Sequence, residues 1–136
     1  MITCLALQDN KIYKIKEYVD DNSGLHWTGA DVHAWPAIMR YEVFDGYVEM
    51  VQIYVAEDGR RHGVGKKLMK NLEKIVKGLG IYRIIITAAV RPDEVFGQFL
   101  EKMKYYRVFN SDRPYDFFWE KKLRGYKKNE QRKLVA

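Results

Sequence analysis

The residues that decide the fold read Glu57-Asp58-Gly59-Arg60-Arg61-His62-Gly63-Val64-Gly65-Lys66-Lys67. They follow a long apolar stretch and open an amphipathic one, so we expect them to join a strand to a helix. A helix N-terminus presents unpaired backbone N–H groups and the positive end of the helix dipole. Gly63 and Gly65 keep side chains away from these amides, and the neighbouring Arg, His and Lys residues add positive charge. The junction is therefore predicted to bind phosphate.

Two known phosphate-binding motifs do not fit this junction. A P-loop requires Gly-x-x-x-x-Gly-Lys and then Ser or Thr, but Arg60 stands at the first glycine and Lys67 at the hydroxyl position. A dinucleotide fingerprint requires Gly-x-Gly-x-x-Gly, and Leu68 stands at its third glycine. Both nucleotide-binding classes are therefore disfavoured.

The segments before the junction predict a strand, a helix and a hairpin. Residues 1–7 are typical of a first strand, and Ile12, Ile15 and Val19 recur at helical spacing, which predicts an amphipathic helix over 10–21. Strands are then expected at 38–44 and 47–56, joined by a two-residue turn at Asp45-Gly46. The second of these strands is apolar on both faces, so we expect it to be central in its sheet.

The segments after the junction predict a helix, a strand, a second helix and a final hairpin. The first helix should begin at Val64 and stop at Gly78 and Gly80, and a buried strand should cover 81–90. The second helix should begin near Pro92, with Asp93 as its cap. Its buried face should hold Val95, Phe96, Phe99, Leu100 and Met103. With closing strands at 105–110 and 115–123, the order predicts an α/β (α+β) domain whose helices pack on one mixed sheet.

Length and composition limit the remaining possibilities. The chain has 136 residues, 47% of them hydrophobic, which suits one compact domain. No apolar run approaches the roughly 18 residues of a membrane span, and the N-terminus does not resemble a secretory signal, so no membrane partner is expected. Cys4 is the only cysteine, which excludes an intrachain disulfide and fits a cytoplasmic location. The net charge of +6 indicates an anionic partner, and residues 124–136 form a basic tail that is either solvated or contacts phosphate or nucleic acid.

Three segments resemble the GNAT superfamily of N-acetyltransferases. Arg60-Arg61-His62-Gly63-Val64-Gly65 fits that family's Arg/Gln-x-x-Gly-x-Gly/Ala signature. Residues 51–55 resemble its fourth strand, and 99–103 resemble its helix segment Phe-Tyr-Glu-Lys-Leu. The resemblance is best over 47–123. It implies a single GNAT-like domain over residues 1–123, with a mixed, mostly antiparallel central sheet flanked by helices.

The resemblance also implies acetyl-coenzyme A as cosubstrate, without a metal. In the family the loop amides hold the coenzyme A pyrophosphate and the splayed strand pairs with pantetheine. Transferred to this chain, the cofactor-binding residues are Ile53, Tyr54, Val55, Arg60, Arg61, His62, Gly63, Val64, Gly65 and Lys66. Backbone N–H groups near Tyr54 and Val55 would hold the thioester carbonyl. His26, His33 and His62 show no metal-ligand spacing with one another.

The catalytic residues are less well defined. Glu49 lies eleven residues before Arg60, a spacing at which some family members carry a catalytic glutamate, so it is the candidate base. Alternatively, Glu49 is solvated or pairs with Arg40. Leu100 occupies the position of the family's usual catalytic tyrosine, which departs from the pattern and puts the general acid in doubt.

Two functions fit this sequence. The first is an N-acetyltransferase that transfers acetyl to a primary amine, of a small molecule or a protein, by direct attack in a ternary complex. Its acceptor cleft is expected between the predicted first helix and the loop 111–115, where Trp27 and Trp35 are either pocket or core residues. The second is a non-catalytic protein of the same fold that binds coenzyme A or nucleic acid, which Leu100 and the basic surface favour. Family members are often dimers, so a homodimer is a further expectation.

Overall fold

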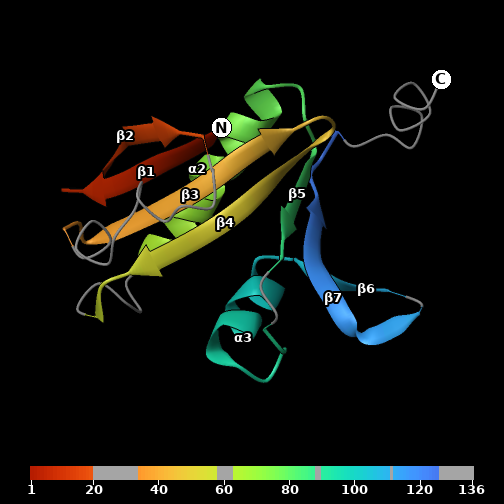
Figure 1. The fold of residues 1–136 in the computed structure, drawn as a ribbon. Coiled ribbons are helices and arrows are strands. Elements are labelled where there is room, and N and C mark those ends of the chain that lie inside the picture. Colours follow the sequence, from red (N-terminus) through yellow and green to blue (C-terminus); the bar gives the residue numbers. More distant parts are fainter. Residues whose placement is uncertain (20–33, 58–62, 88–89, 111, 126–136) are drawn as a thin grey trace. The chain divides into compact units, whose positions relative to one another are not determined.

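The computed structural model describes residues 1–19, 34–57, 63–87, 90–110 and 112–125. Within these residues it contains seven strands and two helices (Figure 1). In chain order the elements are β1 (Ile2–Gln8), β2 (Lys11–Tyr18), β3 (Ala37–Phe44), β4 (Tyr47–Val55), α2 (Val64–Gly78), β5 (Arg83–Ile86), α3 (Val95–Lys102), β6 (Tyr106–Asn110) and β7 (Arg113–Lys122).

The strands form a mixed sheet that is mostly antiparallel. Hydrogen bonds link them in the order β2-β1-β3-β4-β5-β7-β6. β4 and β5 are parallel, whereas β1 with β2, β1 with β3, β5 with β7 and β6 with β7 are antiparallel. The predicted fold class, the strands at β3 and β4 with their Asp45-Gly46 turn, and the central place of β4 are confirmed.

Two compact units can be distinguished within this domain. The first comprises Met1–Val43 and Met50–Lys74, and the second comprises Phe44–Glu49 and Ile75–Ala136. The first unit therefore holds β1, β2, most of β3 and β4, and the N-terminal part of α2. Each unit is described by itself below.

The helix predicted over residues 10–21 is wrong, because Lys11–Tyr18 form strand β2. Asp9 and Asn10 both adopt positive φ, 50° and 65°, which makes a tight turn that brings β2 back against β1. The three-residue spacing of Ile12 and Ile15 places them on opposite faces of a strand. Ile12 faces α2, and Ile15 packs against Ala6 and Ile38. Apolar residues three positions apart thus fit either one face of a helix or the two opposite faces of a strand that is covered on both sides.

A bulge interrupts the pairing of β2 with β1. Leu5 lies opposite Lys14, whereas Cys4 lies opposite Lys16, so Ile15 is the extra residue. The bulge increases the local twist of this strand.

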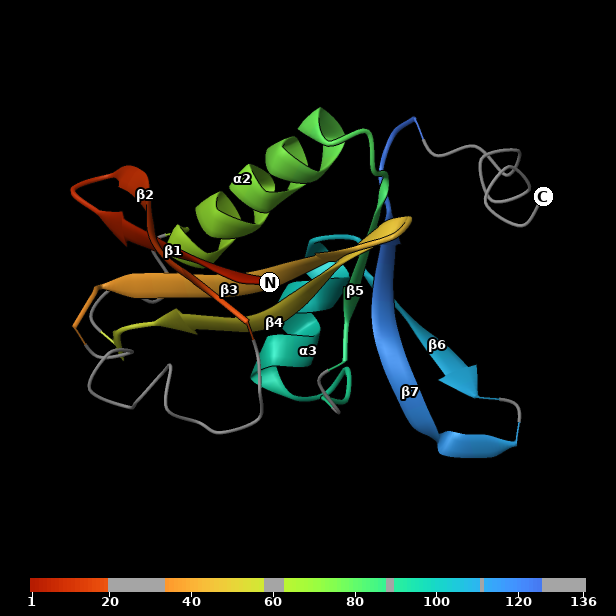
Figure 2. The same ribbon diagram turned by 45° about the horizontal axis from the view of Figure 1, so that its top comes forward.

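In the first unit, α2 packs on one face of the strands (Figure 2). Leu68, Met69 and Leu72 are fully buried, and the opposite flank of the helix carries lysines. Leu7 of β1 is buried and lies opposite Ile12, which faces α2. None of the helices that the structure describes is long and apolar enough to cross a membrane.

The end of α2 confirms the predicted glycine stop. Gly80 has a φ of +75°, and its N–H donates to Lys77 O at 2.9 Å. Ile81 N–H reaches back to Val76 O at 3.1 Å, which completes a Schellman motif. This bond ties Ile81 to the helix, so β5 begins only at Arg83 and is shorter than the predicted strand over 81–90. Leu79 follows the last helical residue and is 53% exposed.

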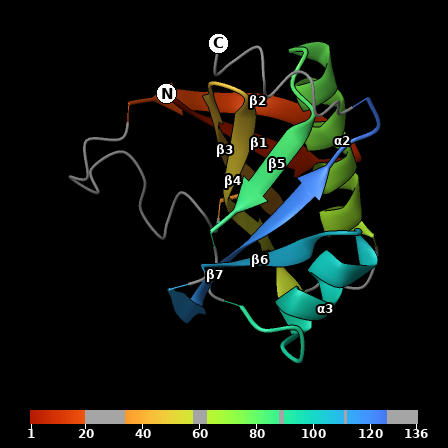
Figure 3. The same cartoon turned by 90° about the vertical axis from the view of Figure 1, so that its right-hand side faces the viewer.

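In the second unit, β5, β7 and β6 lie side by side (Figure 3). Ile84 and Ile86 of β5 are buried, as is Trp119 of β7. Glu120 is also buried and accepts a hydrogen bond from Arg83 Nε at 2.5 Å. A buried carboxylate requires such a partner, so this ion pair fixes the two strands in register.

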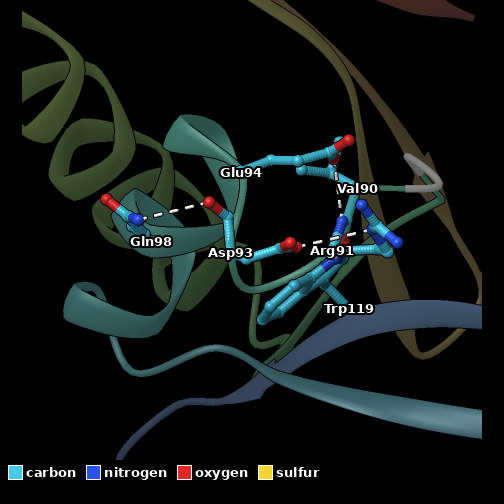
Figure 4. Close-up of polar contacts among 6 residues, drawn as sticks. All are labelled: Val90, Arg91, Asp93, Glu94, Gln98 and Trp119. Atoms are coloured by element: carbon cyan, nitrogen blue, oxygen red, sulfur yellow. Dashed lines mark hydrogen bonds and ion pairs between the residues drawn. The ribbon is translucent and has the colours of Figure 1, made fainter.

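The N-cap of helix α3 lies one residue later than predicted (Figure 4). Its N-cap is Glu94, not Asp93, and the Glu94 side chain accepts a hydrogen bond from Arg91 N at 2.9 Å. Asp93 instead pairs with Arg91, and its carbonyl accepts from Gln98 Nε2. Because the helix starts later, Val95 is its first residue and is 85% exposed, which contradicts its predicted burial. Leu100 and Met103 are buried as predicted.

The side chain of Trp119 joins the segment before α3 to strand β7. Trp119 Nε1 donates to Val90 O at 2.9 Å, and the indole ring is buried (Figure 4). A buried indole N–H needs an acceptor, and this bond provides it while holding the backbone in front of α3.

Tyr41 gives the fold a specific dependence on alkaline pH. Burial raises the pKa of Tyr41 above its ordinary value of 10.0, although a hydrogen bond with Thr3 opposes the shift. The folded protein thus holds the phenol proton more tightly than the unfolded chain does, so this stabilisation is complete below pH 10 and is lost as the pH rises further. We expect the free energy of unfolding, measured by urea denaturation, to fall less steeply above about pH 10 in Tyr41→Phe than in the wild type. Parallel pH curves for the two proteins would contradict this assignment.

Candidate functional site

The phosphate-binding junction predicted from the sequence is the beginning of α2. Gly63 adopts a φ of +76°, and its carbonyl accepts the first helical hydrogen bond, from Lys67 N at 3.0 Å. Gly63 is therefore the N-cap, and the amides of Val64, Gly65 and Lys66 lie in the first turn, where helix geometry supplies no acceptor. The first turn contains no acidic residue that would oppose an anion.

Gly63 leaves open space at this point. A Cβ atom built on Gly63 would meet no heavy atom within 4 Å, and the residue is exposed. An anion can approach the first-turn amides closely only where no side chain intervenes, so this arrangement fits a phosphate group. Arg60, Arg61 and His62, predicted to take part, lie outside the described residues.

The two lysines that follow have different environments. Lys66 is exposed beside Gly63. The Nζ atom of Lys67 donates to the backbone carbonyl of Asn10 at 2.6 Å and also to its side-chain oxygen. Lys67 thus attaches the β1–β2 turn to the first turn of α2. The sequence did not predict this contact, because the contact exists only if β2 is a strand.

The end of β4 carries the other predicted cofactor residues. Ile53, Tyr54 and Val55 are half-buried, and Ala56 N donates to Pro36 O at 2.8 Å directly after them. Tyr54 packs against Ala6 and Ile38 together with Trp35. Trp35 is therefore a partly buried core residue next to the proposed cofactor strand, whereas Trp27 lies outside the described residues.

Glu49, the candidate base, accepts a hydrogen bond from the neighbouring strand region. It lies in β4 opposite Ile85 of β5, and its Oε1 accepts a hydrogen bond from Thr87 Oγ1 at 2.8 Å. Thr87 was not predicted as a partner of Glu49. It stands directly after the apolar run Ile84-Ile85-Ile86, which pairs in parallel with the strand that carries Glu49. Arg40, the alternative partner, donates to Gln52 Oε1 at 2.8 Å and to Tyr18 OH at 2.6 Å.

Leu100, at the position of the family's usual tyrosine, and the two tyrosines that follow α3 differ in burial. Leu100 is fully buried in α3, so its side chain is part of the core. Tyr105 is also buried, with Lys121 Nζ 5.7 Å from its ring centroid. Tyr106, on β6, is 44% exposed and is the more accessible of the two tyrosines.

The predicted acceptor region is only partly described. The first helix that was expected to line the cleft is strand β2, so that part of the prediction is wrong. Asp112 and Asp116 are exposed, and Asp112 N donates to Asn110 Oδ1 at 3.0 Å in the β6–β7 turn. Over the described ranges, no group of three His, Cys, Asp or Glu side chains is placed to hold a metal ion.

Solved structures similar to this chain are acetyltransferases. The PaiA N-acetyltransferase from Thermoplasma acidophilum, in complex with coenzyme A, is 23% identical with a TM-score of 0.56, covering 65% of this chain and 54% of that chain. A GNAT-family acetyltransferase from Staphylococcus aureus Mu50 is 15% identical, with a TM-score of 0.54 over 66% of this chain and 61% of that one. Ard1 from Thermoplasma volcanium is 16% identical, with a TM-score of 0.51 over 71% and 80%.

At these low identities, the structural similarity establishes a shared fold and no more. The chain spans little more than half the length of PaiA. No curated protein sequence matches it. Residues 15–105, more than half of the chain, match the acetyltransferase (GNAT) family, and this match includes the Gly63 junction, β4 and Leu100. The chain therefore belongs to the acetyltransferase (GNAT) family.

Proposed function

We propose that the chain transfers an acetyl group from acetyl-coenzyme A to a primary amine by direct attack in a ternary complex. The observation that carries the proposal is the N-terminus of α2, where Gly63 is an exposed N-cap with positive φ in front of a first turn without acidic residues. Family membership and the coenzyme A held by the PaiA structure support the same assignment.

The residues present fit the diphosphate part of this cosubstrate. The first-turn amides of Val64, Gly65 and Lys66 would hold the diphosphate, with Lys66 adding a positive charge beside Gly63. Ile53, Tyr54 and Val55, at the end of β4, would lie beside the pantetheine arm. When bound, acetyl-coenzyme A supplies the thioester from which the acetyl group is transferred.

Glu49 is the residue that we assign to proton removal from the incoming amine. An ammonium ion has no lone pair for attack, so a base must take its proton before the amine becomes a nucleophile. The hydrogen bond from Thr87 occupies Glu49 Oε1 and orients the carboxylate, leaving Oε2 as the proposed proton acceptor. Thr87 is accordingly a positioning residue.

The direct test of this proposal is isothermal titration of the purified protein with acetyl-coenzyme A and then with coenzyme A. We expect saturable binding of both. Amines can then be screened by the free thiol that each transfer releases. Absence of binding at millimolar ligand would remove the cosubstrate and with it the proposed enzyme.

The alternative, a protein that binds coenzyme A without turnover, has one observation in its favour. Leu100 is buried where the family usually carries a tyrosine, so this position supplies no proton to a departing thiolate. Saturable binding without thiol release over a broad amine screen would favour this alternative. Thiol release that depends on the amine would exclude it.

Glu49 and Thr87 provide a graded test of the catalytic assignment. We expect Glu49→Gln to lower kcat by about 100-fold or more and to abolish the acidic limb of the pH–rate profile, because a positioned base contributes on that order. Thr87→Val should reduce kcat by only a few-fold, since the base remains but loses its orienting bond. Glu101→Gln, an exposed residue of α3, is the control and should leave the profile unchanged. A wild-type profile in Glu49→Gln would remove Glu49 from the mechanism.

A further inference from the structure

A basic groove lies along α2 in the first unit. Its volume is about 410 Å³, and it is bounded by the lysine-bearing flank of α2 and by Ile12 of β2. The lining residues on the helix side are Gly63, Lys66, Lys67, Lys70, Asn71 and Lys74. We call this feature the lysine groove.

The charges that line the groove all have one sign. Four of its seven lining residues are lysines and none is acidic. Lys66, Lys70 and Lys74 are exposed, so their ammonium groups are accessible from solvent. The groove starts at the N-terminus of α2, where the helix dipole adds positive potential. A concave surface that gathers charges of one sign concentrates their field on a ligand of the opposite sign.

The spacing of the lysines indicates the kind of anion. Lys66, Lys70 and Lys74 are four residues apart, so they succeed one another along one flank of the helix at about 6 Å of axial rise. A single phosphate group would engage one of these positions, and the diphosphate proposed to bind at the first turn would reach Lys66 but not the whole row. A row that extends over two helical turns instead suits a ligand with regularly repeated negative charges, as in the sugar–phosphate backbone of a nucleic acid.

The remaining lining of the groove restricts the choice further. The bases of a duplex are paired and stacked inside it, whereas a single strand can turn a base toward the groove. Ile12 offers an apolar surface to a base, and Asn71 offers an amide that both donates and accepts hydrogen bonds. We propose that the lysine groove binds a single strand of nucleic acid through successive phosphates, a binding activity additional to acetyl transfer.

The test uses fluorescence anisotropy of a short fluorescein-labelled oligouridine, titrated with the full chain at several salt concentrations. Lys70→Glu/Lys74→Glu reverses two charges that lie one and two turns beyond the cofactor junction. We expect this variant to weaken binding by at least about tenfold and to reduce the slope of log K against log salt by about 1.4, since each lost phosphate contact on a single strand contributes about 0.7.

A matched variant separates the groove from net charge. Lys102→Glu/Arg124→Glu reverses two exposed charges outside the groove and changes the net charge equally. It should bind the oligouridine with nearly wild-type affinity and an unchanged salt slope. Equal losses in the two double variants would attribute binding to net charge and overturn the proposal, as would the absence of saturable binding in the wild type.

Titration of the same proteins with coenzyme A keeps this inference distinct from the proposed function. We expect Lys70→Glu/Lys74→Glu to retain coenzyme A binding within a few-fold while it loses oligouridine. If it loses coenzyme A and keeps oligouridine, the groove belongs to the cosubstrate site and the nucleic-acid proposal is overturned. Displacement of the oligouridine by inorganic pyrophosphate at a matched phosphate concentration would likewise assign the groove to a small phosphate ligand. Failure of all coenzyme A binding, with oligouridine binding intact, would overturn only the acetyltransferase proposal.

Discussion

Gly63→Leu is expected to weaken coenzyme A binding by at least about tenfold while leaving the protein folded. Gly63 is the N-cap of α2 at a φ of +76°, and a Cβ atom there would meet no heavy atom within 4 Å. A leucine side chain would occupy the space through which a phosphate reaches the first-turn amides, and each lost charge-assisted hydrogen bond contributes about 1.5–3 kcal/mol. Isothermal titration with coenzyme A measures the change directly.

The control for this prediction is Gly80→Leu, at the other end of the same helix. Gly80 has a φ of +75° and equally open surroundings, so both substitutions place a leucine in the left-handed region at a cost of about 1–2 kcal/mol. The two variants should lose similar free energies of unfolding, but only Gly63→Leu should lose affinity. Equal affinities for coenzyme A would mean that the cosubstrate does not bind at the α2 N-terminus.

Gly97→Ala is expected to lower the free energy of unfolding more than any of the other substitutions named above. A Cβ atom on Gly97 would lie 1.9 Å from Arg91 O, 2.7 Å from Arg91 C and 3.0 Å from Pro92 Cα. These are backbone atoms, and the neighbouring Val90 carbonyl is fixed by the buried indole of Trp119, so the clash cannot be relieved by rotation of a side chain. We expect the free energy of unfolding to fall by about 3 kcal/mol, at the upper end of the usual cost of overpacking. Urea denaturation followed by circular dichroism measures this loss.

Gly78→Ala, in the other helix, is expected to raise the free energy of unfolding. Gly78 is also helical, but a Cβ atom there would meet nothing within 4 Å. Replacing a helical glycine with alanine at an open position stabilises a protein by about 0.5–1 kcal/mol. The same substitution should therefore change stability in opposite directions at the two positions. A Gly97→Ala variant as stable as the wild type would show that the segment before α3 moves without cost.

The strand β4, the helix α2 and the turns beside them were predictable because their signals are local. A glycine pair that opens a lysine-rich helix, the Asp45-Gly46 turn and the glycines after α2 each determine backbone geometry within a few residues. The start of α3 was misplaced because Asp93 is a good cap by composition, whereas Arg91 pairs with its side chain and leaves Glu94 as the N-cap. Competition between nearby side chains is not visible in a pattern of residue types.

The N-terminal region could not be predicted for a different reason. Ile12 and Ile15 have helical spacing, and only the turn at Asp9-Asn10 and the pairing with β1 make this segment a strand. Strand pairing depends on partners distant in the sequence, and it overrides local propensity. The contacts of Thr87 with Glu49 and of Lys67 with Asn10 follow from such pairing, so they also were inaccessible to a residue-by-residue reading.

The bulge in β2 has a consequence for association between copies of this chain. Among the described strands, β2 stands at one end of the sheet order, and an outermost strand offers unsatisfied N–H and C=O groups to any similar strand. The displaced residue at Ile15 breaks the regular spacing of these groups, and Lys11, Lys14 and Lys16 would place like charges against each other if two such strands met. Both features disfavour pairing of β2 with the same strand of another copy.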